Sequence, residues 1–123
     1  MPTVADYDVL QDGPVLLSAG AGQDPDRDFP IEVTDPEPGP RAVLSYMIDP
    51  GPSGVTFDMA FINGLSVSTN VVPSNALPSG AGHARQEVLS GNLFTPSGNN
   101  LRVRVTAGSA HFSDIVIMHQ RTI

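Results

Sequence analysis

The sequence contains no cysteine, no tryptophan and no lysine. The absence of cysteine excludes disulfides, thiol catalysis and cysteine-ligated zinc or iron–sulfur centres. The absence of lysine excludes the nucleotide-binding P-loop, whose lysine contacts the phosphates. Without tryptophan, an aromatic platform for sugar rings has to come from two tyrosines and five phenylalanines, which argues against a strong lectin-like site of that type.

Basic residues are also few. Six arginines stand against 13 acidic residues, which gives a formal net charge of −7. Ten of the acidic residues and two of the arginines fall within residues 1–50. An acidic chain with dispersed arginines is poorly suited to phosphate backbones, so we expect no nucleic-acid partner.

Long apolar runs are missing as well. No segment approaches the roughly 18 consecutive apolar residues of a membrane span. Residues 1–13 have neither the basic start nor the apolar core of a secretory signal. We therefore expect a protein that is cytoplasmic, associated with a virion, or exported by a non-classical route. The length of 123 residues suits one domain, 1–123, with a single core.

The sequence is rich in turn residues and in strand-like alternation. Twelve glycines and twelve prolines interrupt it at short intervals, which leaves no clean helical periodicity. Residues 55–62 (VTFDMAFI) alternate with period two, Asn63 and Gly64 follow, and residues 65–68 resume the alternation. Because both turn residues tolerate a positive φ, this pattern predicts a hairpin with a type I′ turn.

Two other segments, 41–48 and 112–120, are more continuously apolar. This pattern is typical of strands covered on both faces, or of central strands next to a subunit contact, and residues 115–118 (IVIM) are a candidate for such a contact. Further strands are expected at 5–9, 14–19, 29–33, 83–89 and 101–105, with loops at 18–28, 35–40, 49–54 and 72–82. The sequence thus predicts an all-β fold, an antiparallel β-sandwich of jelly-roll type with about eight strands and little or no helix.

Arg102 and Arg104 alternate with Leu101, Val103 and Val105 in the strand expected after residues 97–100. If the apolar residues face the core, both arginines face solvent. There they keep one face of the sheet hydrated and oppose aggregation. The alternative is that the paired guanidiniums hold a carboxylate of a ligand or partner.

Asp24, Asp26 and Asp28 alternate within the acidic stretch DPDRD. Carboxylates at such spacing are ligands that Ca²⁺ prefers, but Phe29 stands where an EF-hand loop needs glycine. A solvated acidic loop is the simpler interpretation, and a calcium site at these three aspartates is the alternative. We expect no other cofactor.

The three histidines give weak signals for chemistry. His111 and His119 have the same parity and would share a face of one strand, yet eight residues separate them by roughly 26 Å, too far for one metal ion. His83 remains a candidate for a mixed site. A Ser–His–Asp arrangement can be drawn with His111 and Asp114, but the G-x-S-x-G motif of an activated serine is absent. We therefore expect a protein that is not an enzyme.

Two segments carry a resemblance to a known family. AFINGLSV (60–67) and TPSGNNLRVRV (95–105) resemble galactose-binding-like jelly-roll domains, which occur as carbohydrate-binding modules and as accessory domains of glycosidases. In those domains one strand ends in Asn-Gly and a later G-x-N-x-L-x-V-x-V begins another. The likeness covers about residues 55–118 and implies the fold. The family's sugar contacts lie in variable loops, and no residue of this chain matches them.

Two hypotheses for function remain open. In the first, the chain is a non-catalytic binding module for a glycan or a protein, which uses loops 18–28 and 72–82, with Arg102, Arg104, Asn75 and His83 as candidate contacts. In the second, it is a homo-oligomeric structural subunit of a larger assembly, such as a virion decoration or appendage protein.

Overall fold

The computed structural model describes residues 3–32, 41–80 and 82–122. Within them, seven strands and one short 3₁₀ turn follow each other along the chain. They are β1 (Thr3–Gln11), β2 (Val15–Ser18), β3 (Asp26–Ile31), β4 (Arg41–Ile62), β5 (Ser68–Leu77), β6 (His83–Ser90), η1 (Gly91–Leu93) and β7 (Asn99–Thr122). No helix of the described residues is long and apolar enough to cross a membrane.

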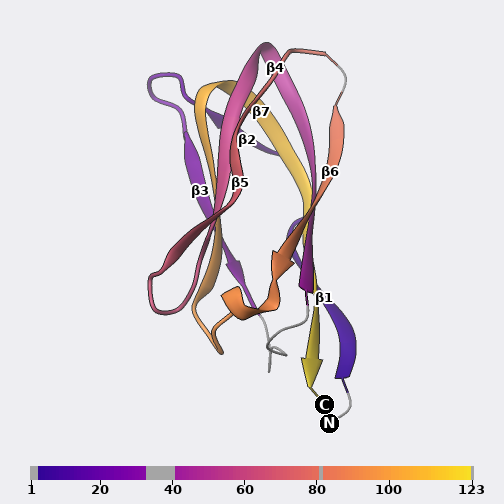
Figure 1. Cartoon of the computed structure of the whole chain (residues 1–123). Coiled ribbons are helices and arrows are strands. Elements are labelled where there is room, and N and C mark those ends of the chain that lie inside the picture. Colours follow the sequence, from indigo (N-terminus) through magenta and orange to yellow (C-terminus); the bar gives the residue numbers. More distant parts are fainter. Residues whose placement is uncertain (1–2, 33–40, 81, 123) are drawn as a thin grey trace.

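The sandwich is organised by the two longest strands, β4 and β7. They pair antiparallel along most of their length and arch over together at one end of the molecule (Figure 1). The first sheet has the order β3, β7 (99–107), β4 (55–62), β5. The second sheet has β1 and β2 beside β7 (109–122), followed by β4 (41–50) and β6. The predicted antiparallel jelly-roll sandwich is confirmed.

The arch explains why residues 49–54 are not the loop that the sequence predicted. They lie within β4, and the pairing with β7 shifts between Pro50 and Val55. Gly54 and Gly108 cross here with φ angles of 76° and 71°. A Cβ on Gly108 would meet the carbonyl oxygen of Gly54, so glycine is needed for the close approach as well as for the positive φ.

The core lies between the two sheets. The ring of Phe57, on the first sheet, contacts Tyr46 and Phe112 of the second sheet edge-to-face, with centroid distances of 6.5 and 5.6 Å. All three side chains are buried. Val55, Phe57, Met59 and Phe61 face inward, as their alternation predicted, and so do Leu101, Val103 and Val105. Side chains from both halves of each long strand therefore fill one core.

The predicted hairpin after residue 62 is confirmed, but its turn type is wrong. The loop spans residues 63–67, so the alternation at 65–68 does not continue as a strand until Ser68. Asn63 Oδ1 accepts hydrogen bonds from the backbone N–H groups of Leu65 and Val67, at 2.9 and 3.1 Å. Ser66 has the positive φ, 60°, in place of the two residues that a type I′ turn requires.

Two other predicted loops are shorter than expected. The first part of the loop expected at 72–82 is strand, since β5 continues to Leu77. Pro73 is tolerated there because β5 is an edge strand, and an edge strand does not need every N–H group to pair with a neighbouring strand. The loop expected at 18–28 ends where β3 begins at Asp26. Residues 83–89 form a strand as predicted. The loop predicted at 35–40 lies outside the described residues.

A bulge at Asp114 reverses the inward and outward sides of β7. Asp114 has a φ of 49°, and the pairing of β7 with β4 shifts between Ser45 and Met47. Phe112 is buried before the bulge, and Ile115 and Ile117 are buried after it. His119 is consequently buried while His111 is exposed. The prediction that the two histidines share a face is therefore wrong.

Candidate functional site

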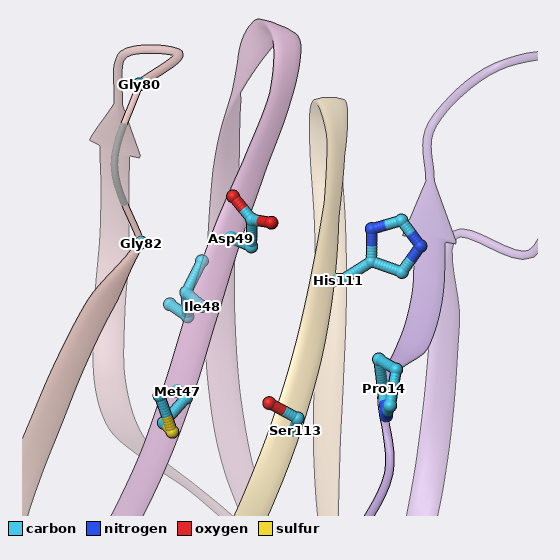
Figure 2. A pocket seen from close by; sticks show the side chains of 8 residues that line it. All are labelled: Pro14, Met47, Ile48, Asp49, Gly80, Gly82, His111 and Ser113. Carbon is cyan, nitrogen blue, oxygen red and sulfur yellow. The ribbon is translucent and has the colours of Figure 1, made fainter.

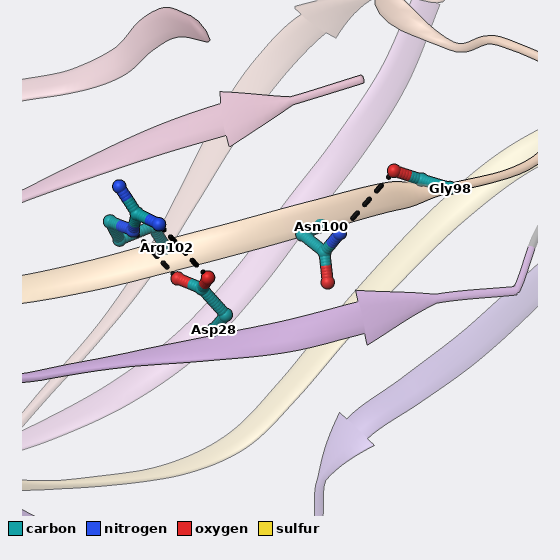
Figure 3. Close-up of polar contacts among 4 residues, drawn as sticks. All are labelled: Asp28, Gly98, Asn100 and Arg102. Carbon is teal, nitrogen blue, oxygen red and sulfur yellow. Dashed lines mark hydrogen bonds and ion pairs between the residues drawn. The ribbon is translucent and has the colours of Figure 1, made fainter. Parts of the chain in front are cut away.

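The outer face of the first sheet is charged. Arg102 donates from Nε and Nη2 to the two carboxylate oxygens of Asp28, at 2.7 and 3.0 Å (Figure 3). Arg104 Nη2 lies 2.8 Å from Asp58 Oδ2. Asp26 is the register partner of Arg104 on β3. The two arginines thus lie on the solvent side, as predicted, and each holds a carboxylate of this same chain.

These ion pairs change the acid–base behaviour of their members. The hydrogen bond from Arg102 lowers the pKa of Asp28 below its ordinary value, and the same bond raises the pKa of Arg102. The hydrogen bond to Asp58 raises the pKa of Arg104. Asp28, Arg102 and Arg104 are therefore charged at neutral pH. Binding of an external carboxylate by these arginines stays a prediction, and such a ligand has to compete with Asp28 and Asp58.

The acidic stretch has a different surrounding from the one that calcium binding needs. Asp24 lies in the loop before β3, whereas Asp26 and Asp28 lie on β3 opposite Arg104 and Arg102. No group of three or more histidines or carboxylates in the described residues is placed to hold a metal ion. Calcium at Asp24, Asp26 and Asp28 stays a prediction, which thermal melting with and without CaCl₂ tests.

The other two candidate contacts lie apart from the arginines. Asn75 is on β5, half-buried and opposite Phe57, so it faces the inner side of the first sheet. His83 opens β6 at the edge of the second sheet and is exposed. The structure brings Arg102 and Arg104 together, but it does not join them with Asn75 and His83 in one site.

The outer face of the second sheet carries a row of apolar side chains, which we call the apolar row. Tyr7 pairs with Met118, Met118 with Val43, and Val43 with Val88, so the row crosses all four strands at this level. Residues directly opposite each other in antiparallel strands point to the same side. Tyr7, Met118 and Val88 are 67%, 41% and 62% exposed. In the next row, Val9 and Val116 extend the apolar surface.

A groove borders the same face nearer the arch. It has a volume of about 600 Å³ and is open to solvent. Figure 2 shows Asp49 on β4 and His111 and Ser113 on β7, with Met47 beside them and Pro14 on the far side of β7. Asp49 and His111 are register partners, so their side chains stand next to each other on the sheet. Gly80 and Gly82 complete the rim, and they are the part of the predicted contact region 72–82 that reaches the groove.

The groove offers polar groups without the geometry of catalysis. Asp49, His111 and Ser113, all within the described part of the chain, make no hydrogen bond to one another, so no activated serine results. Asp114, which the sequence offered as the acid, lies at the bulge. A carboxylate, an imidazole and a hydroxyl on an open sheet face suit hydrogen bonding to a polar ligand.

A second hollow lies on the arch, near the predicted contact loop 18–28. Its volume is about 500 Å³. The residues that line it are Ser18, Ala19, Gly20, Pro52, Ser53, Gly108 and Ser109. None of them carries a charge or an aromatic ring, so this hollow offers mainly backbone and hydroxyl groups.

Sequence reasoning identified part of these surfaces. Residues 115–118 were a candidate subunit contact, and Val116 and Met118 are the ones that face outward. It did not single out Tyr7, Val43 and Val88, because they lie on three strands that are distant in sequence and join Met118 in one row only once the strands are paired. Asp49 and Ser113 of the groove were also not identified as candidates. The alternation of β4 indicates that residues 47 and 49 face outward. Their pairing with Ser113 and His111 follows only from the register of β4 and β7, which the sequence does not give.

No family model and no curated protein sequence matches this chain. Solved structures do match. A chain of the structure of infectious bursal disease virus, Gx strain, superposes with a TM-score of 0.65 at 11% identity over 98% of this chain. A chain of the T=1 particles derived from that virus gives a TM-score of 0.59 at 12% identity over 97%. This chain spans about a third of the length of these viral chains, 33% and 31%.

Carbohydrate-binding modules also match. The CBM22-1 xylan-binding domain of Xyn10C from Paenibacillus barcinonensis superposes with a TM-score of 0.56 at 12% identity, over 98% of this chain and 83% of that domain. The resemblance to jelly-roll carbohydrate-binding modules is therefore confirmed at the level of the fold. The neighbours include both carbohydrate-binding modules and chains of virus structures, and at such low identities they establish the jelly-roll fold alone.

Proposed function

We propose that this chain is a non-catalytic structural subunit that associates with other protein subunits through the outer face of its second sheet. The observation that carries the proposal is the apolar row. Contiguous apolar side chains on the surface of a folded domain are costly to leave in water and are typical of protein contacts. One of the viral chains with the same fold comes from a structure of virus-derived T=1 particles, which is consistent with this use of the fold.

The contrast with the first sheet supports the choice of face. There the corresponding positions carry the ion pairs Arg102–Asp28 and Arg104–Asp58. Charged side chains on a sheet face keep it hydrated and oppose stacking. One face of the sandwich is thus suited to solvent and the opposite face to a protein surface.

Sedimentation velocity over a range of protein concentrations tests this proposal. We expect the unaltered chain to associate and Met118→Asp to sediment as a monomer, because it places a charge in the middle of the apolar row. Leu65→Asp is the matched control, since Leu65 is even more exposed but lies in the 63–67 loop. Association that survives Met118→Asp, or that Leu65→Asp abolishes equally, contradicts the proposal.

Glycan binding is the second candidate function, and the groove is the observation that favours it. Its carboxylate, imidazole and hydroxyl can hydrogen-bond sugar hydroxyls, while Met47 and Pro14 offer apolar contact. The Paenibacillus domain of the same fold is named as xylan-binding. Among the described residues that line this groove there is no phenylalanine or tyrosine, which ranks the candidate second.

Affinity electrophoresis in gels that contain soluble xylan or other polysaccharides tests the second candidate. We expect retardation that Asp49→Ala and His111→Ala remove. Asp26→Ala is the control, because it deletes an exposed acid on the opposite sheet. Equal mobility of all four proteins with every polysaccharide contradicts glycan binding in the groove.

A further inference from the structure

We infer that the protein bound on the second sheet is a second copy of this chain, related by a two-fold axis that crosses the strands at the level of Ser45. This inference rests on the proposed function, since it names the partner for the same face. Along β4 the outward positions are Arg41, Val43, Ser45, Met47 and Asp49, while the residues between them are buried. Each of these five positions defines one level of the face, and Ser45 is at the middle level. An axis at that level places the Arg41 half of one copy over the Asp49 half of the other.

Charge selects this axis over the other in-plane choice. Arg41 lies at one end of the face and Asp49 at the other, both on β4. An axis across the strands reverses the strand direction, so each Arg41 lies over Asp49 of the second copy. An axis along β4 would place Arg41 over Arg41 and Asp49 over Asp49, which is repulsive. In the preferred arrangement the opposite-charge pair occurs twice.

Apolar side chains of β4 and β6 also match across this axis. Val43 lies over Met47 of the second copy and Val88 over Ala84, whereas Met118 lies over Ser113, the β7 partner of Met47. Met47 is 46% exposed. On the axis itself, Val9 and Val116 lie over their own counterparts. The polar residues of the middle level, Ser45 and Gln86, likewise lie over their own counterparts, on β4 and β6.

The area is sufficient for a stable dimer. Five levels of outward residues extend about 26 Å along the strands, and four strands extend about 14 Å across them, before the side chains at the margins are added. This gives on the order of 600 Å² per subunit, or about 1,200 Å² in total, which reaches the range of specific interfaces.

The arrangement has a consequence for the groove. Asp49 lies in the groove beside His111, so Arg41 of the second copy enters it and adds a guanidinium to the carboxylate, imidazole and hydroxyl already there. Dimerisation and any polysaccharide in the groove therefore compete for the same surface.

A single introduced cysteine tests the axis directly, because the chain has none of its own. Packed sheets lie about 10 Å apart, which is too far for a disulfide, so a short bifunctional maleimide is the appropriate cross-linker. We expect Ser45→Cys to give covalent dimers at low micromolar concentration. Thr56→Cys, on the outer face of the first sheet, is the control and stays monomeric.

Charge reversal tests the pairing of the two ends. We expect Arg41→Glu alone and Asp49→Arg alone to weaken dimerisation about tenfold, since each affects two exposed pairs. The double variant Arg41→Glu/Asp49→Arg restores it. Restoration together with cross-linking at Ser45 supports the axis across the strands.

The outcomes separate this inference from the proposed function. If Met118→Asp abolishes association but the double reversal restores nothing, or Ser45→Cys gives no covalent dimer, the face is an interface and the two-fold arrangement is wrong. If association persists in Met118→Asp, the proposed function itself is wrong. A chain that stays monomeric at millimolar concentration overturns the second copy as the partner.

Discussion

The two sheets of this sandwich share their central strands and differ in what they present to the surroundings. In the first sheet, a row across the outer face reads Asp26, Arg104, Asp58. In the second, the apolar row occupies the corresponding face with uncharged side chains of four strands. Both rows involve β4 and β7, so the same pair of strands has charged side chains on the outer face of one sheet and apolar side chains on the outer face of the other.

This difference separates stability from association. The inner faces of both sheets contribute to a single core, whereas most outward groups contribute little to holding the monomer together. The exposed ion pair Arg102–Asp28 is worth less than about 1 kcal/mol, and exposed apolar groups contribute only once they are covered. Asp58 is the exception, because its carboxylate is buried and depends on Arg104. Substitutions inside the sandwich should therefore affect both sheets alike, and substitutions outside should affect only one.

Phe57→Ala should have the largest effect on the free energy of unfolding. It should destabilise both sheets together, because they share one core. Phe57 is fully buried and contacts rings on the opposite sheet. Loss of such a side chain costs about 3–5 kcal/mol of unfolding free energy, including the cavity that it leaves. Urea denaturation followed by circular dichroism measures this, and one transition of unchanged steepness is expected. Two separate transitions would mean that the sheets do not depend on one core.

Gly108→Ala should have the next largest effect, at the arch where one sheet becomes the other. Gly108 has a φ of 71° and approaches the backbone of Gly54 closely. A side chain there costs about 1–3 kcal/mol. Gly13→Ala is the control, since no atom lies within 4 Å of a Cβ at that position. Equal urea midpoints for the two variants would contradict the role of the arch.

Tyr46 should give the second sheet a sensitivity to alkaline pH. Burial, together with the neighbouring Glu87, raises the pKa of Tyr46 from 10.0 to about 12. Since the folded pKa is the higher one, the contribution of the neutral phenol is complete below pH 10 and is lost as the pH rises towards 12. The loss is about 1 kcal/mol at pH 11. Urea unfolding at pH 8 and pH 11 should show it in the unaltered chain and not in Tyr46→Phe.

Asp28→Asn should have the smallest effect, and it concerns the first sheet. The guanidinium of Arg102 lowers the pKa of Asp28 from 3.8. The contribution of the pair is therefore present above pH 3.8 and is lost as the pH falls below it. The pair is exposed, so the difference in stability between the unaltered chain and Asp28→Asn should be under about 1 kcal/mol at pH 7. It should decrease as the pH falls below 3.8, and a difference that does not change with pH would mean that the ion pair is not its source.

Much of the architecture was accessible from the sequence because it depends on local alternation. The inward residues of 55–62 and 101–105 and the hairpin after residue 62 follow from a period of two and an Asn-Gly pair. Local patterns were insufficient where long-range contacts compensate for turn residues. The turn residues of 49–54 predict a loop, yet β4 continues through them because β7 arches alongside.

The candidate surfaces were less accessible, for a physical reason. Tyr7, Val43, Val88 and Met118 come from four strands that are distant in sequence, and a row exists only once their register is fixed. The register of β7 in turn depends on the bulge at Asp114, and neither the composition nor a turn motif in the sequence predicts that bulge. The apolar character of 115–118 indicated a contact, but not which of its residues face it.

The bulge at Asp114 decides which later side chains of β7 face the core. In a strand of the same sequence that alternated regularly from Phe112 onward, Val116 and Met118 would face the interior, and Ile115, Ile117 and His119 would face the surface. Deleting Asp114 would therefore remove the extra residue and leave the later side chains on the sides that they now occupy.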